Sequence, residues 1–275
     1  MRLAISNIAW DVAEDEAVAN LLLRSQVDAI DVAPGKYFPQ PTQATEADIR
    51  GVRQWWRTHG IEITGMQSLL FGTTGLNLFG SPESQDAMLR HLDAVCRIGA
   101  GLGAPRLVFG SPKNRDRSGC TDAQAHDMAV DFFHRLGTIA ARHGVWICLE
   151  PNPPCYGANF MTDSASTLRV VRSVDHPAIR MQCDTGAMAI NGEDPAPTLT
   201  TCADWIGHVH ASEPDLLPLG DGPTDHAAMA RALEDRLPQA LVSIEMLATP
   251  LEAHTISIAR ALQVAATHYR HGRDA

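Results

Sequence analysis

Asn7-Ile8-Ala9-Trp10-Asp11 is the stretch of this sequence that decides between two parallel α/β folds. It closes the first β-rich segment, at the turn where an open, doubly wound sheet carries a glycine-rich phosphate loop. The stretch contains no glycine. A closed (β/α)₈ barrel needs no glycine-rich loop at its first turn, so the sequence favours the barrel.

Seven further β-rich segments follow the first, and a stretch of helical length separates each from the next. The eight segments are residues 3–8, 29–32, 61–67, 106–109, 145–150, 179–184, 206–210 and 241–245. Their spacing leaves room for one helix and a loop between consecutive strands, which makes neighbouring strands parallel. We therefore predict an α/β fold, a (β/α)₈ TIM barrel of eight parallel strands, with residues 1–275 in a single domain.

Capping residues support the helices between these strands. Thr121 with Gln124 three residues later is a capping box, and Gly144 marks the end of the same helix. Thr249-Pro250 predicts the start of the last helix, because a hydroxyl cap followed by proline is typical of a helix start.

Composition excludes several classes of function. The 275 residues include 22 Lys and Arg against 32 Asp and Glu, a formal net charge of −10, which disfavours a nucleic-acid partner. No apolar run reaches the ~18 residues that a membrane helix needs. The six cysteines form no C-x-x-C pair and are typical of thiols in a reducing compartment. We expect a cytoplasmic protein with no membrane association, and a homo-oligomer stays open.

Each of the last four strands ends on a residue of metal-ligand type, namely Glu150, Asp184, His210 and Glu245. Strand ends of one barrel meet at its C-terminal rim, where a divalent cation would neutralise the three carboxylates. Taken singly, Asp184 could cap a turn, Glu150 could be solvated, Glu245 could pair with an arginine, and His210 could be a packed core residue. As a set they predict a site for Mn²⁺, with Mg²⁺, Co²⁺, Fe²⁺ and Zn²⁺ as alternatives.

Further polar residues lie near the strand ends and are candidates for binding a sugar-like substrate. His208 shares the inward face of its strand with His210. It could support a metal ligand through a hydrogen bond, contact the substrate or be a packed core residue. Lys113 begins a loop with Arg115 and Arg117 that is either solvated or clamps an anionic group. The candidate substrate contacts are His208, Asn7, Gln67, Lys113, Asn152 and Tyr156.

The quartet Glu150, Asp184, His210 and Glu245 resembles the metal site of the xylose isomerase-like sugar isomerase/epimerase superfamily. That superfamily includes ketose 3-epimerases, hydroxypyruvate isomerase, inosose isomerases and dehydratases, and the type IV endonucleases. The resemblance covers essentially the whole chain. It implies that the metal holds the carbonyl and hydroxyl oxygens of a small polyol ketone. It also implies that Glu150 and Glu245 are catalytic and move a proton through an enediolate, while Asp184 and His210 act only as ligands.

Three positions depart from the ketose 3-epimerases. Ala187 stands where those enzymes carry a histidine, Tyr156 where they carry a glutamate, and Leu216 where they carry an arginine. The family residues hold substrate hydroxyls or stabilise charge. The departures leave the metal site intact and weigh against a free-ketose 3-epimerase.

The leading hypothesis is a metal-dependent isomerase or epimerase of a keto-sugar, a sugar phosphate or a cyclic polyol ketone. The alternative is a metal-dependent lyase or dehydratase acting on a keto-polyol, which shares the proton abstraction. A non-catalytic sugar-binding barrel and a nuclease like the type IV endonucleases are less favoured. The nuclease would need further histidines, where strands three and four end near Gln67 and Phe109.

Overall fold

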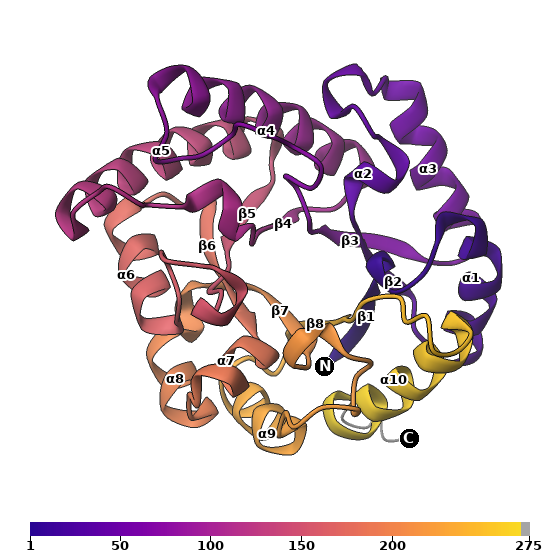
Figure 1. Ribbon diagram of the computed structural model, residues 1–275. Helices are drawn as coiled ribbons and strands as arrows, with labels where there is room; N and C mark the ends of the chain where they lie inside the picture. Colours follow the sequence, from indigo (N-terminus) through magenta and orange to yellow (C-terminus); the bar gives the residue numbers. More distant parts are fainter. Residues whose placement is uncertain (271–275) are drawn as a thin grey trace.

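The computed structural model describes residues 1–270 and shows a closed barrel of eight parallel strands (Figure 1). The strands lie in sequence order around the barrel, and β8 pairs with β1 to close it. They are β1 Arg2–Ser6, β2 Ala29–Val32, β3 Glu62–Met66, β4 Arg106–Phe109, β5 Trp146–Leu149, β6 Ile179–Asp184, β7 Ile206–Ser212 and β8 Leu241–Glu245. The predicted (β/α)₈ barrel is therefore confirmed.

Helices surround the barrel and connect each strand to the next (Figure 1). Two short ones, α2 and α7, lie between a strand and its longer outer helix. The helices are α1 Asp15–Arg24, α2 Pro34–Tyr37, α3 Glu46–Thr58, α4 Pro82–Leu102, α5 Asp122–His143, α6 Ser164–Val174, α7 Thr185–Asn191, α8 Pro195–Cys202, α9 His226–Arg236 and α10 His254–Tyr269.

Helix α5 shows how local sequence sets these elements. Thr121 caps it by accepting from the Gln124 backbone N–H, and Gly144 ends it in the left-handed conformation at φ 69°. Phe133 and Leu136 lie on its buried face. The helix follows the predicted caps because its apolar face and both ends agree.

The bounds of four strands and of the last helix differ from the sequence-based expectation. β3 and β5 are each one residue shorter at both ends, so Glu150 lies just after β5. β1 ends at Ser6, because the Ser6 hydroxyl accepts from a backbone N–H of the 3₁₀ turn Asn7–Ala9. β7 continues to Ser212. The last helix begins at His254 and not at Pro250, since the Thr249 hydroxyl accepts from the Leu251 N–H in a separate turn.

The barrel has two interiors of different character. Apolar side chains such as Phe132, Val242 and Leu262 form the core between strands and helices. The space enclosed by the strands holds buried polar groups, among them Asp31 and His208. Buried polar groups are costly unless they are paired, and the Asp31–His208 pair meets this requirement.

Within residues 1–270, none of the helices has both the length and the apolar character needed to cross a bilayer. That residues 1–275 form one domain stays a prediction, and residues 271–275 lie outside the described part of the chain.

Candidate metal centre and active-site pocket

The four strand-end residues meet at one point on the C-terminal rim. Ligand-type atoms of Glu150, Asp184, His210 and Glu245 all lie within 4.8 Å of one another. Nδ1 of His210 lies 3.1 Å from a Glu245 oxygen, 3.6 Å from a Glu150 oxygen and 3.9 Å from an Asp184 oxygen. One imidazole nitrogen thus faces three carboxylates, as the strand-end pattern predicts.

The donor set fits a divalent cation. All four side chains are buried, and Oε1 of Glu150 has no hydrogen-bond partner among residues 1–270. Burial, then repulsion from Glu245 and Glu150, raises the pKa of Asp184 well above its ordinary value. A bound cation would relieve this repulsion, and three carboxylates with one imidazole suit Mn²⁺ and related ions.

Asp184 combines the two roles that the sequence left open for it. Its Oδ1 accepts from the Ala187 backbone N–H at 2.7 Å, which caps α7, and from the Ser212 hydroxyl at 2.9 Å. Its Oδ2 faces His210. The cap therefore orients the carboxylate, and the second oxygen remains for a metal.

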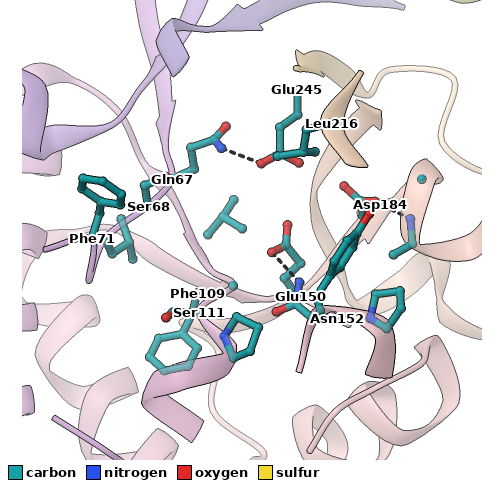
Figure 2. Close-up of a pocket in the computed structure, with 18 of the residues that line it drawn as sticks. Gln67, Ser68, Phe71, Phe109, Ser111, Glu150, Asn152, Asp184, Leu216 and Glu245 are labelled. Carbon is teal, nitrogen blue, oxygen red and sulfur yellow. Dashed lines mark hydrogen bonds between the residues drawn. The ribbon is translucent and has the colours of Figure 1, made fainter. Parts of the chain in front are cut away.

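Each of the two glutamates is oriented by one side-chain amide (Figure 2). Nε2 of Gln67 donates to Oε1 of Glu245 at 2.5 Å, and Nδ2 of Asn152 donates to Oε2 of Glu150 at 3.2 Å. In both cases the other oxygen of the carboxylate faces His210. Two carboxylates on opposite sides of the cluster thus have one oxygen toward the metal position and one held by an amide.

Glu150 has additional support from β4 and the loop after it. Arg115 is fully buried and donates to the Glu150 backbone carbonyl at 2.7 Å and to the side-chain oxygen of Asn152. A Cβ at Gly110 would lie 1.8 Å from Oε2 of Glu150, so only glycine leaves room for the carboxylate. The sequence predicts Arg115 only as one cation of a loop that is either solvated or clamps an anionic group, and nothing in it indicates the burial of this side chain.

His208 lies deeper in the barrel than the quartet. Its Nε2 donates to Oδ2 of Asp31 at 2.7 Å, and the same oxygen lies 3.9 Å from Nε2 of His210. Burial raises the pKa of Asp31, but attraction to His208 outweighs it and holds the pKa at about 2. Asp31 was missed from the sequence, although a carboxylate within the apolar strand residues 29–32 was a signal for it.

A cavity of about 500 Å³ opens above the quartet. Of the predicted substrate contacts, Gln67, Asn152 and Tyr156 line it, whereas Asn7, His208 and Lys113 do not. Asn7 is buried and accepts from the Ala33 backbone N–H at 2.8 Å, and Lys113 is exposed. The structure brings together the metal quartet and half of the predicted substrate contacts.

Comparison with known proteins gives a consistent picture. The family described as "Xylose isomerase-like TIM barrel" matches residues 21–265. A structure of D-psicose 3-epimerase in the presence of D-fructose superimposes with a TM-score of 0.81 at 17% identity, covering 98% of this chain and 99% of that one. A structure of the IOLI protein with a bound zinc atom has a TM-score of 0.76 at 16% identity, covering 98% of both chains.

One curated relative matches over a short segment. A 3-dehydroshikimate dehydratase of Bacillus anthracis is 29% identical over 82 residues, which is 30% of this chain and 28% of that protein.

Proposed function

This chain belongs to the xylose isomerase-like TIM barrel family, and from that membership we propose that it is a metal-dependent isomerase or epimerase of a small sugar or sugar derivative. The observation that supports this most directly is the meeting of four ligand-type side chains, from four strand ends, within 4.8 Å of one another. The similar D-psicose 3-epimerase is named for a small sugar, and its structure was determined in the presence of D-fructose.

Glu150, Asp184, His210 and Glu245 would hold the cation, with Mn²⁺ as the favoured ion and Mg²⁺, Co²⁺, Fe²⁺ and Zn²⁺ as alternatives. The zinc in the IOLI structure supports a divalent ion in this fold. When bound, such an ion supplies Lewis acidity that makes a hydrogen beside a carbonyl easier to remove.

Glu150 and Glu245 are the proposed catalytic pair. Asn152 and Gln67 each fix one carboxylate oxygen, so the two carboxylates are aimed at a substrate carbon between them (Figure 2). One glutamate removes the proton and the other returns it from the opposite side, which inverts the carbon. Return of the proton to the neighbouring carbon gives isomerisation. Tyr156, at the cavity wall, is the proposed contact for a substrate hydroxyl.

The test is exchange of carbon-bound hydrogen with D₂O in Mn²⁺-loaded protein over a panel of ketoses and cyclic polyol ketones. We expect solvent deuterium at the carbon beside the carbonyl, and loss of that label in Glu245→Gln. Glu16→Gln makes the same chemical change on exposed helix α1 and should leave exchange intact. Separately, Mn²⁺ should raise the melting temperature of the wild type but not of Asp184→Asn. Equal exchange in wild type and Glu245→Gln would refute the proposal.

A dehydratase of a keto-polyol is the second candidate, favoured by the matched segment of 3-dehydroshikimate dehydratase. It uses the same proton abstraction, followed by loss of hydroxide from the next carbon as water. Mass spectrometry of the product separates the two reactions, because elimination lowers the mass by one water and epimerisation leaves it unchanged.

A further inference from the structure

The pocket above the quartet is strongly acidic. Its lining includes the acidic residues Glu150, Asp184, Glu245 and Asp215; Glu213 also lines it, but its carboxylate is buried and bonded to Gly220, Thr224 and His226. Among the lining residues that the structure describes, none is Lys, Arg or His. A divalent ion would offset only part of this charge, so the field in the cavity repels phosphate and carboxylate groups.

The cations of the loop after β4 do not change this conclusion. Arg115 is directed away from the cavity, to the Glu150 carbonyl and to Asn152. Arg117 bonds to Asn159 and pairs with Asp122. Neither lines the pocket, so the structure does not form the anion clamp that was one reading of this loop.

Part of the pocket lining is apolar. Phe71 lies on the side remote from Asp184, whereas Leu216 lies near Glu245; Leu69, Phe109 and Leu247 are further apolar residues of the lining (Figure 2). Phe71 is 85% exposed and Leu247 is 50% exposed, so both offer apolar surface to a ligand in the pocket. In Figure 2, Phe71 lies across the pocket from Asp184, so a molecule bound at the quartet would extend toward it.

Leu216 is placed in this wall at a conformational cost. Asp215 and Leu216 have φ angles of 58° and 52°, in the left-handed region that side chains other than glycine rarely adopt. Two hydrogen bonds stabilise this backbone conformation. The Leu216 carbonyl accepts from the Leu247 N–H at 2.9 Å, and the Asp215 N–H donates to the Tyr156 hydroxyl at 2.7 Å. Leu216 therefore keeps its place in the pocket lining despite an unfavourable backbone conformation.

We propose that this pocket takes an uncharged keto-sugar derivative whose end remote from the carbonyl carries an apolar substituent, seated on an apolar wall formed by Phe71, Leu216 and Leu247. The proposal rests on the proposed function for the reacting end and adds the chemistry of the other end.

The test compares three end groups on one sugar skeleton. The probes are D-fructose, its 6-O-benzyl ether and its 6-phosphate, together with the same set built on D-tagatose and on L-sorbose. Dissociation constants are measured by calorimetry on Mn²⁺-loaded protein. In at least one series, we expect the benzyl ether to bind about ten-fold tighter than the parent sugar and the phosphate about ten-fold weaker. A phosphate ester that binds as tightly as the benzyl ether, or no binding by any benzyl ether, overturns the proposal.

Two variants locate the substituent. Phe71→Arg keeps an exposed side chain at the rim but introduces a cation, so the preference for benzyl over phosphate should fall at least about ten-fold. Leu251→Arg is the matched control, because Leu251 is 90% exposed and does not line the pocket. Leu216→Ser serves as a second variant of the wall. An unchanged preference in both Phe71→Arg and Leu216→Ser also overturns the proposal.

Failure of this proposal can be distinguished from failure of the proposed function. Deuterium exchange is followed on the same probes. Benzyl-selective binding without exchange by any probe supports the substrate class and refutes the isomerase or epimerase. Deuterium exchange together with tighter binding of the phosphate ester supports the isomerase or epimerase and refutes the substrate class.

Discussion

Oδ2 of Asp31 lies between two histidines of β7, at 2.7 Å from Nε2 of His208 and 3.9 Å from Nε2 of His210. Nδ1 of His210 faces the three carboxylates, so its other nitrogen is directed to Asp31. A carboxylate behind a ligating histidine fixes the ring and raises its basicity. At 3.9 Å Asp31 does not hydrogen-bond Nε2 of His210, which has no partner among residues 1–270, so Asp31 would act on a cation at the proposed metal site through its charge.

Asp31→Asn tests this relationship. The amide oxygen can still accept from His208, but the negative charge is lost, and we expect Mn²⁺ affinity to fall about ten-fold with the fold retained. Affinity is measured by titrating Mn²⁺ and following free Mn²⁺ by electron paramagnetic resonance. Asp28→Asn is the control, because Asp28 lies just before the same strand but is exposed and pairs with Arg2. Equal affinities in the two variants would show that Asp31 serves packing alone.

Arg115 and Lys113 provide a matched pair in one loop. Arg115→Ala leaves the Glu150 carbonyl and the Asn152 side chain without a buried donor, and we expect about 3 kcal/mol of lost stability. Lys113→Ala removes an exposed charge and should cost less than about 1 kcal/mol. Urea unfolding measures both. A loss in Arg115→Ala as small as that in Lys113→Ala would contradict a supporting role for Arg115.

The residues of this site differ in how far the sequence predicts their positions. Glu150, Asp184, His210 and Glu245 could be predicted as a cluster because strand ends of a barrel share one rim, whatever the details of packing. The burial of Arg115 could not be predicted, because it depends on the Glu150 carbonyl 35 residues away, and sequence spacing does not reveal that partner. The pairing of His208 with Asp31 joins residues 177 apart and crosses the barrel.

The start of the last helix and the conformation of Leu216 also could not be predicted from the sequence. Thr249-Pro250 has the local signature of a helix start, yet Thr249 caps only a short turn at Leu251 and the helix begins at His254. No sequence rule places a leucine at positive φ, because that conformation is disfavoured locally and exists only where tertiary contacts impose it. Local signals predict elements, and competing long-range bonds decide loops.

Glu213 predicts how stability depends on pH. It is buried and accepts from the backbone N–H groups of Gly220 and Thr224 and from Nε2 of His226, each at 2.9 Å. Burial raises the pKa of Glu213, but these donors, His226 first, outweigh it and lower the pKa from 4.5 to about 2. The ionised carboxylate therefore stabilises the fold fully above about pH 4.5, and this contribution is lost as the pH falls toward about 2.

The measurement is the difference in unfolding free energy between wild type and Glu213→Gln. We expect a gap of up to about 3 kcal/mol that is constant from about pH 7 to about pH 5 and shrinks at lower pH. A gap that stays constant down to about pH 3 would show that the charge of Glu213 does not stabilise the loop that holds Leu216.

Gly110→Ala tests whether the position of Glu150 matters to the site. An added Cβ would lie 1.8 Å from Oε2 of Glu150, so the carboxylate has to leave the metal position. The backbone of Gly110 is not in the left-handed region, and the fold should persist. Because a displacement of about 1 Å can lower a rate about 100-fold, we expect a loss of that order in deuterium exchange, together with weaker Mn²⁺ binding. Gly51→Ala is the control: no described atom lies within 4 Å of its added Cβ, and alanine within α3 should raise stability by about 0.5–1 kcal/mol. Full exchange activity in Gly110→Ala would mean that Glu150 tolerates a second position, and its assignment as a proton-transfer group would then fail.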